Sequence, residues 1–153
     1  MIEHVKVGML TTADEAGHLS SRPMYVLKMD ADGAIWFFTK AHSGKAHALG
    51  HVNLTFTDPG DADFLSITGS AELVQDRAMI DALWRPAAKP WFKGGKDDPE
   101  LALLKVTIDC AEIWDESDST MVRLIAMAAA AVTGHPNATL RGDHERISNP
   151  TRH

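Results

Sequence analysis

The chain has 153 residues, which is enough for one domain with a sizeable core. Its hydrophobic fraction of 44% and charged fraction of 24% are ordinary for a soluble globular protein, and its net charge of -6 argues against a nucleic-acid surface, because such domains are usually basic. A single cysteine, Cys110, excludes an internal disulfide, and the most apolar window, 124–132, is far too short to span a bilayer. Residues 1–10 carry charges and no long apolar run, so we expect a cytoplasmic protein without a membrane partner.

Short apolar and β-branched runs alternate with turn signals along the first three quarters of the chain, which is typical of a mainly β domain. The predicted strands cover six segments: 7–12, 19–29, 34–39, 52–57, 64–74 and 101–114. Pro23 cannot donate a ladder hydrogen bond, so its part of the second strand is expected at a sheet edge or bulge, where a ligand can meet the backbone. The third strand is nearly all apolar, which predicts burial on both faces.

Two features of the later strands predict irregular pairing. Gly69 lies inside the fifth strand, where a glycine often marks a bulge or a close backbone approach. In the last strand, the alternation of apolar and polar residues falters at Ala111, which suggests a bulge there. On this alternation Cys110 lies on the apolar face, so we interpret it as a small core residue rather than a nucleophile.

Helix signals occur at three places. Asp76 is expected to cap a helix that ends near Leu83, Ser43 a short helix over 43–49, and Ser119 a helix that continues to Val132. Residues 85–99 contain three prolines and two adjacent glycines, which predicts a long loop. We therefore expect one domain over 1–133 and a polar tail over 134–153; a closed or split antiparallel barrel fits the pattern best, although other α+β meanders fit as well.

The stretch 20–45 combines cations and hydroxyl groups in a way that suits a phosphate group. Arg22 and Lys28 lie on the second strand, Thr39 ends the third, and Ser43 and Lys45 follow it. A helix that starts at Ser43 would add free backbone N–H groups for an anion. A solvated hairpin with ordinary surface charges is the alternative interpretation.

The order and spacing of several short motifs resemble the pyridoxamine 5′-phosphate oxidase-like superfamily of FMN-binding split barrels, and within it the bacterial general stress protein branch. The motifs are S-S-R-P-M at 20–24, W-F-F-T at 36–39, S-G-K at 43–45, G-S-A at 69–71, D-R at 76–77, L-W at 83–84, W-F at 91–92, D-D-P at 97–99 and A-E-I-W-D at 111–115. The resemblance implies a six-stranded antiparallel split β-barrel with a crossing helix and a C-terminal helix.

The resemblance also implies which residues contact the flavin. Phosphate and ribityl contacts are expected from Arg22, Thr39, Ser43 and Lys45, and isoalloxazine contacts from the neighbouring Pro23, Met24 and Phe38. Trp114 matches the tryptophan that closes over the flavin from the other subunit, although plain core packing is an equal alternative. Gly44 stands where the oxidases have an arginine, and no oxidase substrate motif follows Trp114, so we do not expect pyridoxamine phosphate oxidation.

The cofactor implied is FMN, with FAD, deazaflavin or haem as alternatives, in a homodimer with two flavin sites at its interface. Two functions remain open: an FMN-dependent oxidoreductase of unknown substrate, and a protein that buffers or senses flavin without turnover. Trp84 and Trp91 could line a substrate cleft, but anchoring of the 85–99 loop is the favoured interpretation. His47 and His51 could share a helix face, yet a solvated face is favoured and no metal site is expected.

Overall fold

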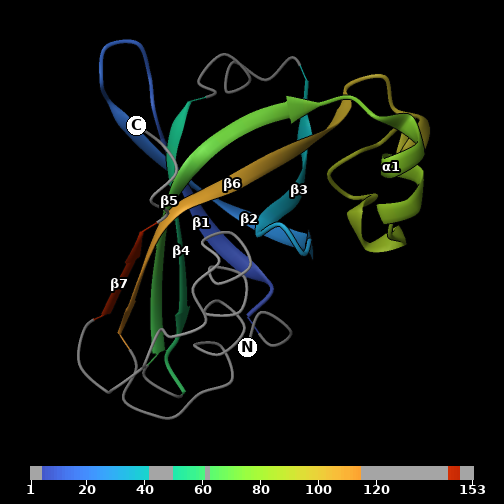
Figure 1. The fold of residues 1–153 in the computed structure, drawn as a ribbon. Helices are drawn as coiled ribbons and strands as arrows, with labels where there is room; N and C mark the ends of the chain where they lie inside the picture. The colour runs from blue at the N-terminus through green and yellow to red at the C-terminus, as the bar shows by residue number, and fades with distance from the viewer. Residues whose placement is uncertain (1–4, 42–49, 61–62, 115–144, 149–153) are drawn as a thin grey trace.

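The protein is mainly β, a closed six-stranded antiparallel barrel with one short additional strand (Figure 1). This computed structural model describes residues 5–41, 50–60, 63–114 and 145–148. The strands are β1 (Val7–Ala13), β2 (Leu19–Met29), β3 (Ala34–Lys40), β4 (His51–Asp58), β5 (Asp63–Val74), β6 (Leu101–Trp114) and β7 (Glu145–Ser148). In these ranges, no helix is both long enough and apolar enough to cross a membrane.

The strand order is β3-β2-β1-β4-β5-β6-β7, and β3 also pairs with β6, which closes the barrel. The closing ladder is antiparallel and runs from the pair Ala34 and Thr107 to the pair Lys40 and Leu101. All six predicted strands are confirmed, with ends that differ by no more than one residue. The predicted mainly β barrel is therefore confirmed as well.

β7 was not predicted, because its four residues E-R-I-S contain one apolar side chain and show no clear alternation. It lies inside the range assigned to the polar tail and pairs with β6 from Cys110 to Ile113. The helices predicted over 43–49 and 119–132 lie outside the described residues, as does most of the tail.

The apolar residues form two cores, one on each face of β3. Ile35 and Phe37 point into the barrel and join the larger cluster, whereas Trp36 joins a second cluster on the outside. This arrangement follows from the period of two in a strand, and it confirms the predicted burial of β3 on both faces. Ile80 of the helix α1 (Arg77–Leu83) is fully buried in the second cluster, so α1 packs against the outer face of β3.

Helix α1 begins as predicted, because the carboxylate of Asp76 accepts a hydrogen bond from the backbone N–H of Met79 at 3.1 Å. The following loop contains two short 3-10 turns, Pro86–Ala88 and Gly95–Asp97. Figure 1 shows α1 and this loop beside the end of the barrel where β5 ends and β6 begins.

The predicted irregularity at Gly69 is confirmed. The β5–β6 register shifts between Thr68 and Gly69, and a Cβ atom on Gly69 would collide with the carbonyl oxygen of Thr107. The bulge predicted at Ala111 is wrong by two positions, because Thr68 pairs with Cys110 and Gly69 with Ile108, which leaves Asp109 as the extra residue. The close backbone approach at Gly69 fixes the bulge opposite that glycine.

The bulge reverses which side chains of β6 face the barrel. Before it, the core residues are Leu104 and Val106, and after it they are Ala111 and Ile113. Cys110 therefore lies on the outer face and is only half-buried, so the prediction that it is a core residue is wrong. Alternation read without the bulge assigns it to the wrong face.

Candidate functional site

A seam runs between β2 and β3 near one end of the barrel. β2 pairs with β1 from Leu19 to Tyr25, but its ladder with β3 starts only at Val26, opposite Phe37. Among the described residues, segments 19–25 and 38–40 therefore face each other without a shared ladder. Pro23 lies in this part of β2, which confirms the predicted edge position.

Arg22 is the most informative residue at the seam. It alternates with the core residues Met24 and Val26, so it lies on the face of β2 that points into the barrel. Its Nη1 atom is buried and has no hydrogen-bond partner in the described part of the chain. Burial lowers the pKa of Arg22, although a guanidinium stays charged in proteins. A buried cation without a partner is costly, and a bound anion would remove that cost.

Thr39 lies at the same end of the barrel as Arg22. It is half-buried and shares a strand face with Ile35 and Phe37, so it is on the barrel side of β3. Because β2 and β3 are antiparallel, the register that joins Val26 to Phe37 places the start of β2 beside the end of β3. The structure thus brings the predicted contacts Arg22 and Thr39 to one seam.

The other predicted contacts on these strands have different positions. Met24 is 8% exposed and belongs to the barrel core, whereas Pro23 is exposed on the outer face. Phe38 lies on the outer face of β3, with its ring centroid 5.7 Å from that of Trp84 and 5.9 Å from that of Phe92. Phe38 therefore packs against Trp84 at the end of α1 and Phe92 of the following loop. Ser43 and Lys45 lie outside the described residues.

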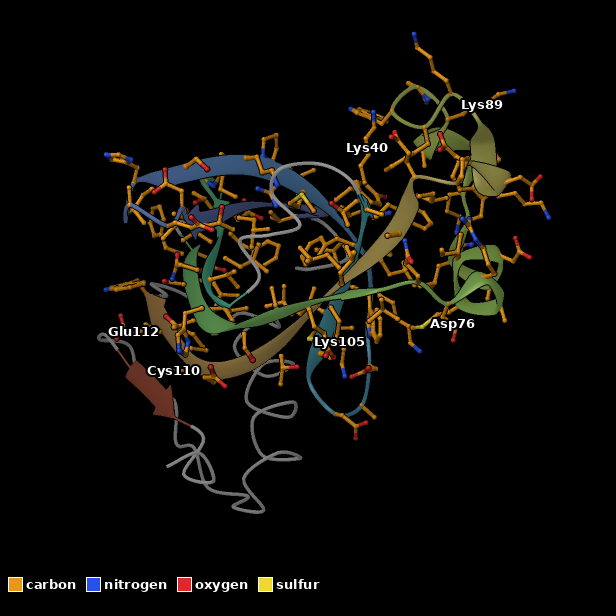
Figure 2. The ribbon with its side chains drawn as sticks, turned by 90° about the horizontal axis from the view of Figure 1, so that it is seen from above. Lys40, Asp76, Lys89, Lys105, Cys110 and Glu112 are labelled. Atoms are coloured by element: carbon orange, nitrogen blue, oxygen red, sulfur yellow. The ribbon has the colours of Figure 1, made fainter. Side chains whose placement is uncertain are left out.

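Trp114 is far from the Thr39 end of this seam along β6. It ends β6 and pairs with Phe64, whereas Thr39 pairs with Ala102 near the start of β6. The twelve positions between 102 and 114 correspond to about 40 Å of strand at about 3.3 Å per residue. Figure 2 shows the same separation, since Lys40 lies at the same end of the molecule as Lys89, far from Cys110 and Glu112.

Trp84 and Trp91 have different environments in the structure. Trp84 packs in the second core against Phe38, which agrees with an anchoring role, but Trp91 is 70% exposed and anchors nothing. The lysines next to Trp91 were not predicted as site residues. The sequence does contain a pattern that could have indicated them, because residues 85–96 carry four Lys or Arg residues and no Asp or Glu.

A metal centre is not visible in the part of the chain that the structure describes. Within it, no three His, Cys, Asp or Glu side chains gather closely enough to hold a metal ion. His51 is exposed at the start of β4, and His47 lies outside the described residues.

Comparison with known sequences identifies the family. Residues 1–137 match the sequence model of the family described as Pyridoxamine 5′-phosphate oxidase like. Because this match covers most of the chain, the protein belongs to that family. The resemblance drawn from the short motifs is thereby confirmed.

Individual relatives agree with this assignment. General stress protein 26 of Bacillus subtilis is 28% identical over 131 residues, which are 81% of this chain and 90% of that protein. The crystal structure of the general stress FMN/FAD binding protein from Xanthomonas citri has a TM-score of 0.63 and 38% identity, and covers 77% of this chain and 85% of that one. A Clostridium acetobutylicum protein related to general stress protein 26 has a TM-score of 0.67 and 25% identity, and covers 75% and 83% of the two chains.

Proposed function

We propose that this protein is a flavin-binding general stress protein that holds FMN at the seam between β2 and β3. The observation that carries the proposal is the buried Nη1 of Arg22, which has no hydrogen-bond partner among the described residues and which suits the flavin phosphate. Family membership and the FMN/FAD binding described for the Xanthomonas citri relative support the same cofactor. FAD is the second candidate, because that relative's description includes both flavins.

The residues present fit such a cofactor. Arg22 would contact the phosphate together with Lys45, and the hydroxyls of Thr39 and Ser43 would contact the phosphate and ribityl chain. Pro23 and the backbone of Met24 border the seam on the β2 side, where an isoalloxazine ring could lie against an edge that has no ladder partner among the described residues. A bound flavin would supply the electron transfer, and the chain would hold the ring and exclude water from it.

The second part of the proposal is a homodimer in which each subunit completes the flavin site of the other. Two pairs of exposed apolar residues lie on the outer face of the barrel, one on strands β1 and β2 and the other on strands β5 and β6. Val7 (48% exposed) pairs with Tyr25 (53%), and Phe64 (45%) pairs with Trp114 (39%). Exposed apolar groups gathered on one face mark an interaction surface. A second copy seated there could place its Trp114 over the flavin.

Two activities are compatible with this site, and both are proposals. The first is a flavin-dependent oxidoreductase of unknown substrate. The second is a flavin-binding protein without turnover, which is favoured by the absence of any carboxyl, imidazole or thiol group in segments 19–25 and 38–40. Steady-state oxidation of NADH or NADPH by the FMN-loaded protein separates them, and the absorbance spectrum of the purified protein distinguishes flavin from deazaflavin or haem.

The phosphate site is tested by flavin titration of Arg22→Ala. Loss of a charge-assisted hydrogen bond worth about 1.5–3 kcal/mol should raise the FMN Kd roughly 10- to 100-fold, with a similar effect expected for Lys45→Ala. Riboflavin lacks the phosphate and should bind wild type and variant about equally. Lys28→Ala, an exposed lysine near the hairpin end of the same strand, is the matched control and should leave FMN binding unchanged.

A second variant keeps this test independent of folding. Arg22→Met retains much of the side-chain volume and removes the buried charge, so the ligand-free protein should melt at the same or a higher temperature. The stabilisation that FMN adds to wild type should then largely disappear in Arg22→Met. An unchanged FMN affinity in both Arg22 variants would move the phosphate site elsewhere.

A further inference from the structure

The loop between α1 and β6 has a firmly fixed backbone. The guanidinium of Arg77 donates to the carbonyl oxygens of Lys96 and Asp98, at 3.4 and 3.2 Å. The carboxylate of Asp98 accepts from the backbone N–H groups of Gly94, at 3.3 Å, and Glu100, at 2.9 Å. These hydrogen bonds organise the 94–100 part of the loop, which directly follows the segment that carries Trp91.

Trp91 is presented to solvent on this fixed loop. Its backbone N–H donates to the carbonyl of Ala88 at 3.1 Å, and the next residue, Phe92, is buried against Phe38. The loop is thus anchored by Phe92, while the indole of Trp91 remains 70% exposed. A large aromatic ring gains much from burial, so a rigid loop that exposes one is typical of a binding surface.

The charged residues nearest to Trp91 in the sequence are lysines. Lys89 and Lys93 lie two residues before and two residues after it, and both are exposed. Lys96 is paired with Asp81 at 3.6 Å, but Lys89 and Lys93 form no ion pair with any residue that the structure describes. In a protein of net charge -6, two exposed lysines next to an exposed indole in the sequence offer cations and an aromatic surface that a planar anionic ligand could use.

We infer that Trp91, Lys89 and Lys93 bind the adenosine phosphate part of a dinucleotide. The indole would stack on the adenine ring, and the two ammonium groups would contact the phosphates. An anionic membrane surface is less suited, because the net negative charge of the chain opposes it.

The loop lies beside the end of β3 that borders the proposed flavin site, so one dinucleotide is proposed to contact both. The carbonyl of Glu100, at the end of the loop, accepts a 2.7 Å hydrogen bond from the N–H of Ala41, directly after β3. Phe38, one residue before Thr39, packs against Trp84 at the end of α1 and Phe92 of the loop. Figure 2 shows Lys40 and Lys89 at the same end of the molecule. This inference rests on the proposed flavin function, and the adenosine phosphate could belong to FAD or to a nicotinamide dinucleotide.

The test is calorimetric titration of the full FMN-saturated chain with ADP. FMN occupies the proposed phosphate site, so ADP reports on the loop alone. Trp91→Ala should raise the ADP Kd roughly 5- to 100-fold, the range expected for loss of one base–aromatic stack, and Trp91→Phe should restore most of the affinity. Lys89→Ala and Lys93→Ala should each weaken ADP binding in a salt-dependent way, whereas Lys6→Ala, an exposed lysine before β1, should not.

Two further measurements distinguish FAD from a nicotinamide dinucleotide as the source of the adenosine phosphate. If it belongs to FAD, Trp91→Ala should weaken binding of FAD but not of FMN. If it belongs to a nicotinamide dinucleotide, the variant should raise the KM for NADH or NADPH at unchanged FMN affinity. Equal ADP affinity of wild type and Trp91→Ala, no ADP binding at all, or Trp91-dependent sedimentation with anionic vesicles in place of ADP binding would overturn the inference. If FMN itself does not bind, the flavin proposal fails, and titration of the FMN-free chain with ADP then tests the loop alone, so the two failures are recognised separately.

Discussion

One carboxylate, that of Asp30, holds the hairpin between β2 and β3. It accepts a hydrogen bond from the indole N–H of Trp36 at 2.9 Å and another from the backbone N–H of Ala34 at 2.9 Å. Above the same indole ring lies the ammonium of Lys105, 5.6 Å from the centroid, and it pairs with Glu72 at 3.2 Å. These contacts orient Trp36 toward the second core, and through it they position the outer face of β3.

The pKa of Asp30 follows from opposing effects. Partial burial raises it, but the hydrogen bonds from Trp36 and Ala34 outweigh burial, so the pKa lies below the ordinary value. A depressed pKa in the folded state means that the ionised carboxylate stabilises the fold. This contribution is fully present above the unfolded-state pKa of about 3.9 and is lost as the pH falls through the folded-state value.

Asp30→Ala should therefore lower the free energy of unfolding at pH 7 by about 1 kcal/mol for each of the two lost hydrogen bonds. As the pH falls from about 4 through the lower folded-state pKa of Asp30, the difference from wild type should shrink, because the wild-type carboxylate becomes protonated over that range. Urea denaturation at pH 7 and pH 3 measures both effects. Asp32→Ala, an exposed residue of the same turn, is the control, and a loss equal to that of Asp30→Ala would contradict this role.

Among the elements, the β5–β6 pair shows how a single glycine sets the register. Gly69→Ala places a methyl group against the carbonyl of Thr107, which is backbone and cannot rotate away. The free energy of unfolding should fall by about 1–3 kcal/mol, as overpacking of a core usually costs. Gly50→Ala is the matched control, since a Cβ atom there meets nothing within 4 Å and its backbone has no positive φ. Thermal denaturation compares the two variants, and equal losses would show that the contact at Gly69 is not limiting.

The six barrel strands could be predicted because each carries its own apolar pattern and is bounded by turn residues. The position of the bulge could not, because it depends on where β5 meets β6, which is a contact between distant segments. The same is true of β7, whose four residues become a strand only beside β6. In the site, motif order identified Arg22 and Thr39, but only the structure shows that the guanidinium is buried without a described partner.

On the scale of the whole molecule, the exposed apolar pairs on the outer face of the barrel predict self-association. Light scattering should give twice the chain mass for the wild type. Phe64→Glu puts a charge into the proposed interface and should give a monomer with weakened flavin binding, because Trp114 of the second copy is then lost. Ala78→Glu, at an exposed position of α1, should remain dimeric. A monomeric wild type that still binds flavin tightly would contradict the proposed interface.

The seam between β2 and β3 also affects the solubility of the chain. An open strand edge that admits a ligand can equally add a strand from another molecule, which is the first step of aggregation. Pro23 limits this risk, because it interrupts the row of N–H donors along the part of β2 that has no described partner on the β3 side. A cofactor lying over the seam would cover the remaining donors. If the proposed function is correct, binding of the flavin would thus protect this protein from aggregation in addition to supplying its electron-transfer group.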